Sequence, residues 1–130
     1  MHKETVTYSD YNGIERTEDF YFNLTEAEIA EMEYSETGSF TERLTKVVAS
    51  KDQPSLIRIF KSFLLDSYGV RSDDGRRFMK SDAIRESFVQ NPAYSILFMK
   101  FARDDKAAAA FVNGVMPRKL EENNVRPINP

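Results

Sequence analysis

Hydrophobic and polar residues alternate near the start of the chain and follow a helical spacing over most of the remainder. The segment TVTYSDYNGIERTEDFYFN contains two β-rich runs around Asn12-Gly13, a pair that supplies the positive φ angles of a tight turn. This pattern predicts a β-hairpin over about residues 5–22. The second run ends in Phe20, Tyr21 and Phe22, so aromatic rings fall on both faces, and one face needs a cover from helices or a second copy.

Two helices are predicted next, over about residues 26–34 and 40–50. Each begins at a capping box, in which a hydroxyl residue and a glutamate three positions later satisfy each other's free backbone N–H groups. The two capping pairs are Thr25 with Glu28 and Ser39 with Glu42.

A third helix is predicted between Pro54, in a first turn, and Gly69, as its stop. It carries the clearest apolar stripe of the chain, which consists of Leu56, Ile59, Phe60, Phe63 and Leu64. The following segment, VRSDDGRRFMKS, predicts a loop or a second small hairpin around Asp74-Gly75.

Three further helical segments follow, and each has a start or a stop signal. Ser81 caps DAIRESFVQ, and Pro92 interrupts it. Tyr94, Leu97, Phe98 and Phe101 then share one helical face. After Asp104-Asp105, a last helix carries Ala107, Ala108, Phe111, Val112 and Val115, and we expect Asn113-Gly114 and Pro117 to end it.

These elements predict a mainly α fold, a small helical domain of five to six helices with an N-terminal β-hairpin (α+β). We expect one globular domain over residues 1–117, with helices over about residues 26–116. Residues 118–130 contain few apolar side chains and two prolines, so they are expected to form a mobile tail.

Composition narrows the possible functions. The chain has no cysteine, which excludes disulfides, thiolate nucleophiles and zinc fingers and favours the cytoplasm. No window approaches a membrane span, so no membrane is expected as a partner.

The net charge of −3 is unevenly distributed along the chain. Residues 1–36 carry two basic residues against ten carboxylates, a balance of −8, which leaves +5 for residues 37–130. Such asymmetry can steer a partner or order copies head to tail, although solvated surface charge explains it too.

Groups for catalysis are scarce. His2 is the only histidine and lies at an end that normally frays. The carboxylates show no spacing typical of a buried catalytic pair, and the five glycines form no phosphate-binding loop. The sequence therefore predicts no enzyme, and it predicts no catalytic residue, cofactor or metal site.

One basic concentration offers an alternative function. Within residues 71–85 it consists of Arg71, Arg76, Arg77, Lys80 and Arg85. This region could bind nucleic acid, but Asp73, Asp74 and Asp82 dilute the positive field. Nucleic acid is thus the second hypothesis.

Three segments of the chain bring a protein family to mind: TVTYSDYNGIERTEDFYFNLTEAEIAEME, FKSFLLDSYGVRSDDGRRFMKS and AYSILFMKFARDDKAAAAFVNGVMP. In order and spacing they resemble the tail assembly chaperones of long-tailed bacteriophages and prophages. The resemblance extends from about residue 5 to residue 117. Its strongest pieces are the hairpin that leads into FYFNLT, the SYGxxSxDGxRFxKS loop and the terminal FVNGxxP.

The resemblance implies a non-enzymatic function. Members of the family bind the long, helical tape measure protein, keep it soluble and help tail-tube subunits polymerise around it before they leave the particle. It further implies self-association, work in the cytoplasm of the bacterial host and absence from the mature virion. Many members are also made as a longer product by ribosomal frameshifting. A mobile tail would suit the point at which such an extension is joined.

The apolar stripes are the candidate partner-binding residues. Most simply they form the core, but part of this surface, or the edge of the hairpin, could be left for a partner. The individual candidates are Phe63, Phe98, Phe101, Phe111 and Met116, and a core role is the alternative for each.

Overall fold

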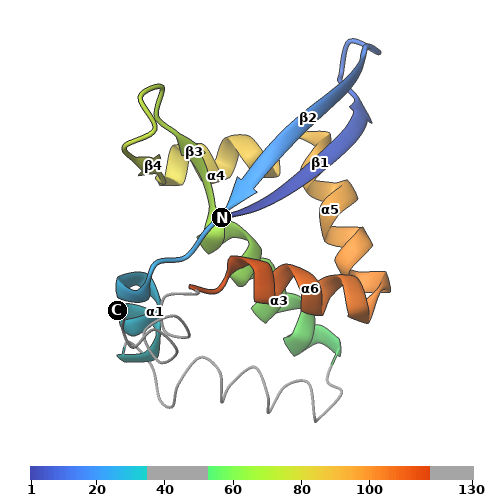
Figure 1. Cartoon of the computed structure of the whole chain (residues 1–130). Helices are drawn as coiled ribbons and strands as arrows, with labels where there is room; N and C mark the ends of the chain where they lie inside the picture. The colour runs from blue at the N-terminus through green and yellow to red at the C-terminus, as the bar shows by residue number, and fades with distance from the viewer. Residues whose placement is uncertain (35–52, 118–130) are drawn as a thin grey trace, which may run out of the picture.

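The computed structural model describes residues 1–34 and 53–117. In these residues five helices and four strands follow one another in the order β1, β2, α1, α3, β3, β4, α4, α5 and α6 (Figure 1). The helix predicted over 40–50 and the tail predicted over 118–130 lie outside the described residues.

The predicted N-terminal hairpin is confirmed, and it begins earlier than expected. Strand β1 (His2–Ser9) pairs with β2 (Glu15–Phe22) in an antiparallel register that runs from His2 opposite Phe22 to Ser9 opposite Glu15. The turn depends on Asp10, whose carboxylate accepts the backbone N–H groups of Asn12 and Ile14 at 2.8 and 2.9 Å. Gly13 takes a φ of 81°, a value that side chains disfavour.

The second hairpin, one of the two alternatives predicted for this segment, also forms, so the expected α+β class is confirmed while the fold is not mainly α in a strict sense. Strands β3 (Tyr68–Arg71) and β4 (Phe78–Met79) extend the sheet to four antiparallel strands in the order β1-β2-β3-β4. The fold is therefore α+β, with more sheet than one hairpin provides. Gly69 is not a helix stop but a strand residue: a Cβ there would lie 2.6 Å from a ring carbon of Phe78.

The helices begin at the predicted signals. They are α1 (Glu26–Tyr34), α3 (Gln53–Ser67), α4 (Asp82–Val89), α5 (Pro92–Arg103) and α6 (Asp105–Val115). The capping box before α1 is present, since the N–H of Thr25 donates to Glu28 at 2.8 Å and the N–H of Glu28 donates to the Thr25 hydroxyl at 3.1 Å. Helix α6 ends at Val115, close to the expected Pro117 and to the predicted limit at 116, but Asn113-Gly114 lie inside the helix and do not end it. A Cβ on Gly114 would collide with the His2 ring.

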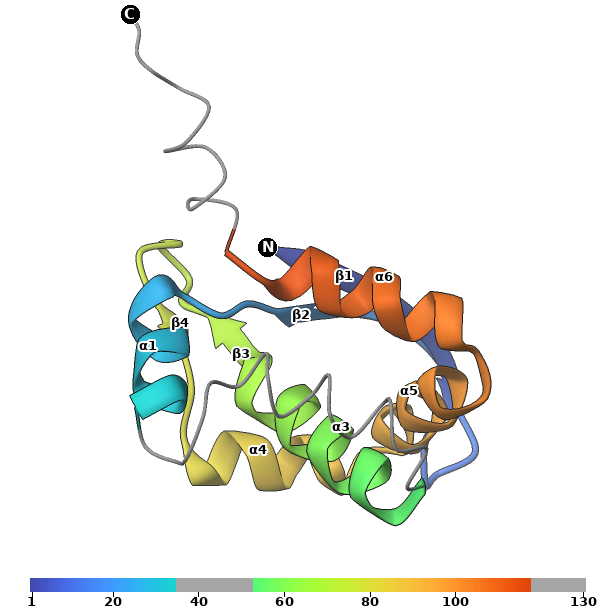
Figure 2. The same cartoon turned by 90° about the horizontal axis from the view of Figure 1, so that it is seen from below.

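The core lies between the helices and one face of the β1–β2 hairpin. Alternate strand residues are buried, which are Val6, Tyr8, Phe20 and Phe22. The helices contribute Phe63, Leu64, Phe88, Ala93, Leu97, Phe101, Phe111 and Val115. Viewed from below, α3, α5 and α6 lie in front of the strands (Figure 2), and in Figure 1 the two hairpins rise from the helices as separate arms.

Candidate functional site

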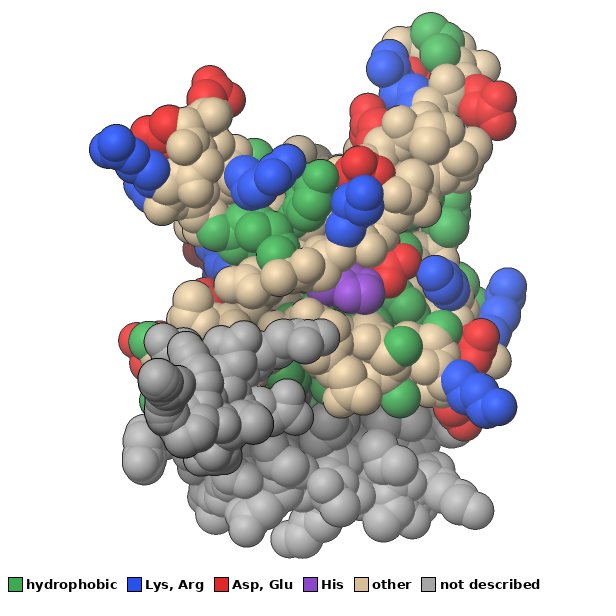
Figure 3. All heavy atoms as spheres, viewed as in Figure 1, with side chains coloured by type: hydrophobic (Ala, Val, Ile, Leu, Met, Phe, Trp, Pro, Cys, Tyr) green, Lys and Arg blue, Asp and Glu red, His purple; other side chains and the backbone are tan. Residues whose placement is uncertain are grey.

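The space between the two hairpin arms is the candidate site, which we call the notch. It encloses about 720 Å³ and is lined by residues 18–21 of β2, Tyr68–Arg71 of β3, and Ser72, Asp73 and Gly75 of the following turn. Figure 3 shows hydrophobic side chains at its base and charged side chains on both arms.

The notch exists because β2 and β3 are paired over a short distance only. Tyr21 lies opposite Gly69 and Phe22 opposite Tyr68, and no further pair follows between these strands. Beyond this point β3 turns toward β4, in a turn closed by a 2.7 Å bond from the Ser72 hydroxyl to the Asp74 carboxylate. The long hairpin β1–β2 continues in another direction, so the sheet splits.

Aromatic side chains border the notch from both faces of the split sheet. Because successive residues of a strand point to opposite faces, Phe20 and Tyr21 lie on either side of β2. On the inner face, the Tyr68 ring stacks on Phe88 with 4.1 Å between centroids. Burial raises the pKa of the Tyr68 hydroxyl. Val70 remains 40% exposed. The base of the notch is thus a fixed aromatic surface with accessible apolar atoms.

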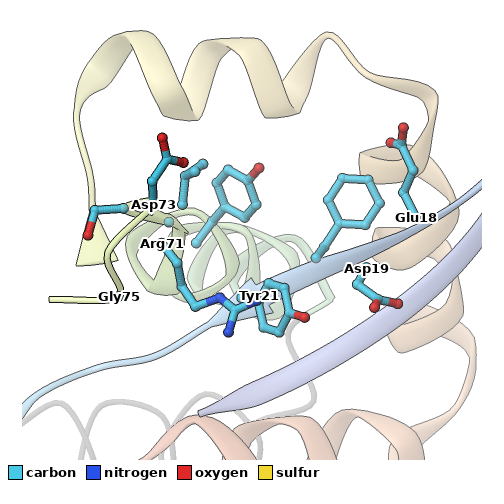
Figure 4. Close-up of a pocket in the computed structure, with 11 residues that line it drawn as sticks. Glu18, Asp19, Tyr21, Arg71, Asp73 and Gly75 are labelled. Carbon is cyan, nitrogen blue, oxygen red and sulfur yellow. The ribbon is translucent and has the colours of Figure 1, made fainter. Parts of the chain in front are cut away.

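Negative charge predominates along the walls. Figure 4 shows Glu18 and Asp19 on one side and Asp73 on the other, with Arg71 extended toward Tyr21. The Arg71 guanidinium lies 4.3 Å from the centroid of the Tyr21 ring. The lining of the notch therefore contains three carboxylates and one guanidinium, and that guanidinium already has an aromatic partner.

Two neighbouring hydroxyl groups hold these carboxylates in place. The hydroxyl of Tyr8 donates to Glu18 Oε1, and that of Thr5 donates to Asp19 Oδ1, both at 2.6 Å. The positions of these charges are consequently set by the hairpin itself.

The basic residues of the alternative site are dispersed. Lys80 Nζ donates to Glu28 and to the backbone oxygen of Asn23, both at 2.7 Å, and Arg85 pairs with Asp82 at 3.0 Å. These two cations serve contacts within the chain. The remaining arginines of the segment, Arg71, Arg76 and Arg77, are exposed on the arm formed by β3, β4 and their turn.

The five predicted partner-binding residues lie outside the notch. Three of them, Phe63, Phe101 and Phe111, are between 0% and 3% exposed. They therefore have the core role that was the alternative to partner binding. Phe98 and Met116 are half-buried and pack against the core from outside. Of the two possible partner surfaces considered from the sequence, apolar stripe or hairpin edge, the notch corresponds to the hairpin edge. The unusual FYF run with aromatic rings on both faces was its only signal.

His2 is ordered, so the expectation of a frayed end is wrong. Its ring meets Phe111 edge to face at 5.2 Å, and Nε2 lies 2.6 Å from the Glu4 carboxylate. Within residues 1–34 and 53–117, no group of three or more His, Cys, Asp or Glu side chains could hold a metal ion. In the same ranges no helix is long and apolar enough to cross a membrane.

Comparison with protein families decides the identity of the chain at family level. The model of a family described as phage tail assembly chaperone matches residues 1–126 of the 130 residues. The chain belongs to the phage tail assembly chaperone family. The resemblance noted in the sequence is thereby confirmed. Comparisons of this chaperone with curated proteins and with solved structures gave no match.

Membership of the tail assembly chaperone family supports a role in phage tail assembly and interaction with phage tail proteins. The fold agrees with a binding role, because the notch presents accessible apolar and charged groups.

Proposed function

We propose that this chaperone binds the tape measure protein, keeps it soluble and promotes assembly of the tail tube around it without catalysing a reaction. The observation that carries the proposal is the family match over residues 1–126. Binding takes place in the cytoplasm of the bacterial host, and the chaperone is absent from the mature virion. Tail-tube subunits are a second partner in this proposal, and the chaperone acts as a homo-oligomer.

The outer surface of α5 supports this proposal. Ile96 and Met99 are 44% and 37% exposed, and Phe98 is half-buried beside them. Met116 is half-buried at the end of α6. Each 100 Å² of apolar surface that such groups bury against a partner contributes roughly 2.5 kcal/mol before the entropic cost of association. The acidic N-terminal region sets the orientation of the partner.

Co-expression with the tape measure protein tests the proposal. We expect more soluble tape measure protein with the chaperone than without it. The double variant Phe98→Ser/Met116→Ser is expected to lower this yield. The matched control, Tyr11→Ser, changes a side chain that is 84% exposed at the tip of the first hairpin. An unchanged yield of tape measure protein when the chaperone is omitted would exclude the proposed function.

The alternative is nucleic-acid binding through residues 71–85. Its support is the exposure of Arg76 and Arg77 at the end of the second arm. If it holds, retention of the chaperone on immobilised DNA falls steeply with salt, because phosphate contacts release counterions. The variant Arg76→Glu/Arg77→Glu then abolishes retention and leaves the yield of tape measure protein unchanged.

A further inference from the structure

The edge of β2 that faces the notch has free ladder positions. In an antiparallel ladder, the backbone groups of alternate residues point to opposite sides of the strand. Asn23 donates its N–H to Ser67 at 2.8 Å, and Tyr21 pairs with Gly69, so the odd-numbered residues face β3. Asp19, in the lining of the notch, and Thr17, just beyond it, therefore direct their N–H and C=O groups to this open side of β2. No strand of the described residues pairs with them there.

The facing edge of β3 repeats this arrangement. Ser72 donates its N–H to Arg77 at 2.8 Å, and Val70 lies opposite Met79, so the even-numbered residues face β4. By the same alternation Arg71 directs its backbone groups toward the notch. Two diverging strands thus present unpaired backbone groups to one space, above an aromatic base.

We infer that the notch binds an extended segment of a partner protein, which adds to β2 as a further strand. Addition of a strand to an exposed sheet edge gains main-chain hydrogen bonds, while the flanking side chains select the sequence. Here the flanking groups are Glu18, Asp19 and Asp73 against Arg71 alone. The segment bound is therefore one in which lysine or arginine alternates with apolar residues.

The lining disfavours other occupants. A second copy that paired through the same edge would bring Glu15, Glu18 and Asp19 close to another set of carboxylates, and facing like charges destabilise a sheet. A helix satisfies its own backbone and would leave the N–H groups of Thr17 and Asp19 unpaired. The phosphates of a nucleic acid would be repelled by the carboxylates of the notch.

The inference goes beyond the proposed function, because it concerns the chemistry of one surface and does not depend on the tape measure protein. The probe is a synthetic peptide of about ten residues in which valine alternates with lysine and threonine, a typical strand length and composition. The matched control peptide has glutamate in place of lysine. Neither peptide titration contains a tail protein. A failure of the peptide to bind therefore leaves the co-expression result valid, and a failure of the co-expression test leaves the peptide result valid.

Amide hydrogen exchange followed by NMR gives the first test. In the free chain, we expect slow exchange at Arg16 and Glu18, which face β1, and fast exchange at Thr17 and Asp19. The lysine peptide is expected to slow exchange at Thr17 and Asp19 about tenfold or more, because their N–H groups enter a new ladder. Slow exchange at both positions in the free chain would overturn the inference, and so would peptide binding without added protection there.

Variants of β2 give the second test. Thr17→Pro removes an N–H on the open edge, where proline is tolerated, and is expected to weaken peptide binding about tenfold. Thr17→Val keeps the backbone and serves as the matched control. Asp19→Asn is expected to weaken binding of the lysine peptide several-fold without removing any N–H group. Equal binding by all three variants, equal binding of the glutamate peptide, or no binding at millimolar peptide would refute strand addition.

Discussion

Two aromatic regions of this chaperone differ in what surrounds them. In the core, Phe111 meets Phe22, Phe63 and Phe101 with ring centroids between 4.6 and 5.9 Å apart, and all four rings are at most 3% exposed. In the notch, aromatic rings border a space where two strands separate. The four core rings are phenylalanines, whereas the notch is lined by Phe20, Tyr21 and Tyr68, so both regions are rich in aromatic residues. The pairing of the strands, and not the number of aromatic residues, decides which region is sealed and which is open.

The largest expected effect comes from breaking the sealed region. Phe111→Ala removes the ring that contacts both the hairpin and the helices, and a buried Phe→Ala change typically costs about 3–5 kcal/mol. Urea unfolding followed by circular dichroism measures the free energy of unfolding. Tyr11→Ala, at a side chain 84% exposed, serves as the control and is expected to stay within about 0.5 kcal/mol of the parent. A loss below about 1 kcal/mol for Phe111→Ala would show that the cluster does not hold the fold together.

The next largest loss of stability is expected from a change at Gly69, which lies where the notch begins. In Gly69→Ala, the new methyl group would lie 2.6 Å from the Phe78 ring and 2.9 Å from the backbone oxygen of Met79. We expect the second arm to shift, with a loss of about 1–3 kcal/mol, the usual range for overpacking. NMR chemical shifts of β3 and β4 should change while those of α5 stay the same. Unchanged shifts in the arm would contradict the close packing of Gly69.

Much of the sealed region could be predicted from the sequence. The capping box at Thr25, the cap at Ser81 and the break at Pro92 placed helix ends, because these signals act on neighbouring residues. The helical stripe likewise contains Phe63 and Leu64, which are both buried, so the core role weighed against partner binding for Phe63 is the one it has in the structure. Local chemistry was sufficient there.

The notch could not be predicted in the same way. Strand β3 has four residues and β4 two, too few for an alternating pattern. The segment around Asp74-Gly75 indicates a loop or a small hairpin but not the strand with which it pairs. The pair that joins the second hairpin to the first, Tyr21 with Gly69, links residues far apart in the sequence. Glycine both ends helices and permits close contact in strands, so the sequence alone does not distinguish these two roles for Gly69. The split sheet is thus a product of tertiary pairing.

A smaller effect should depend on pH, at the contact that ties α1 to the end of the second arm. Burial, the largest single influence, raises the pKa of Glu28, but its bonds to Lys80 and Thr25 outweigh burial and bring the pKa below its ordinary value of 4.5. A carboxylate with a lowered folded pKa stabilises the fold above its unfolded pKa, and this contribution is lost as pH falls through the folded pKa.

Glu28→Gln removes this charge and preserves the capping geometry, since glutamine also serves in a capping box. We expect a loss of about 0.5–1 kcal/mol at pH 7, kept small by solvent screening, and convergence with the parent as the pH falls through the lowered folded pKa of Glu28. Urea unfolding over a pH series measures both. A difference between the two proteins that does not depend on pH would show that the Glu28 carboxylate makes no ionic contribution.

The smallest change in stability is expected at Asp19, and it gives the clearest contrast between the buried core and the notch. Asp19 lies on the wall of the notch, where it accepts the Thr5 hydroxyl at 2.6 Å and has Lys3 at 4.0 Å. Asp19 and its two partners Thr5 and Lys3 are all exposed, so Asp19→Asn should change the free energy of unfolding by no more than about 0.5 kcal/mol. Urea unfolding at low and moderate salt measures this, with Phe111→Ala as the contrasting case. A loss above about 1.5 kcal/mol would mean that the hairpin needs this carboxylate for its own stability. A negligible loss would mean that the charge of the notch can change without cost to the fold, as a surface kept for a partner requires.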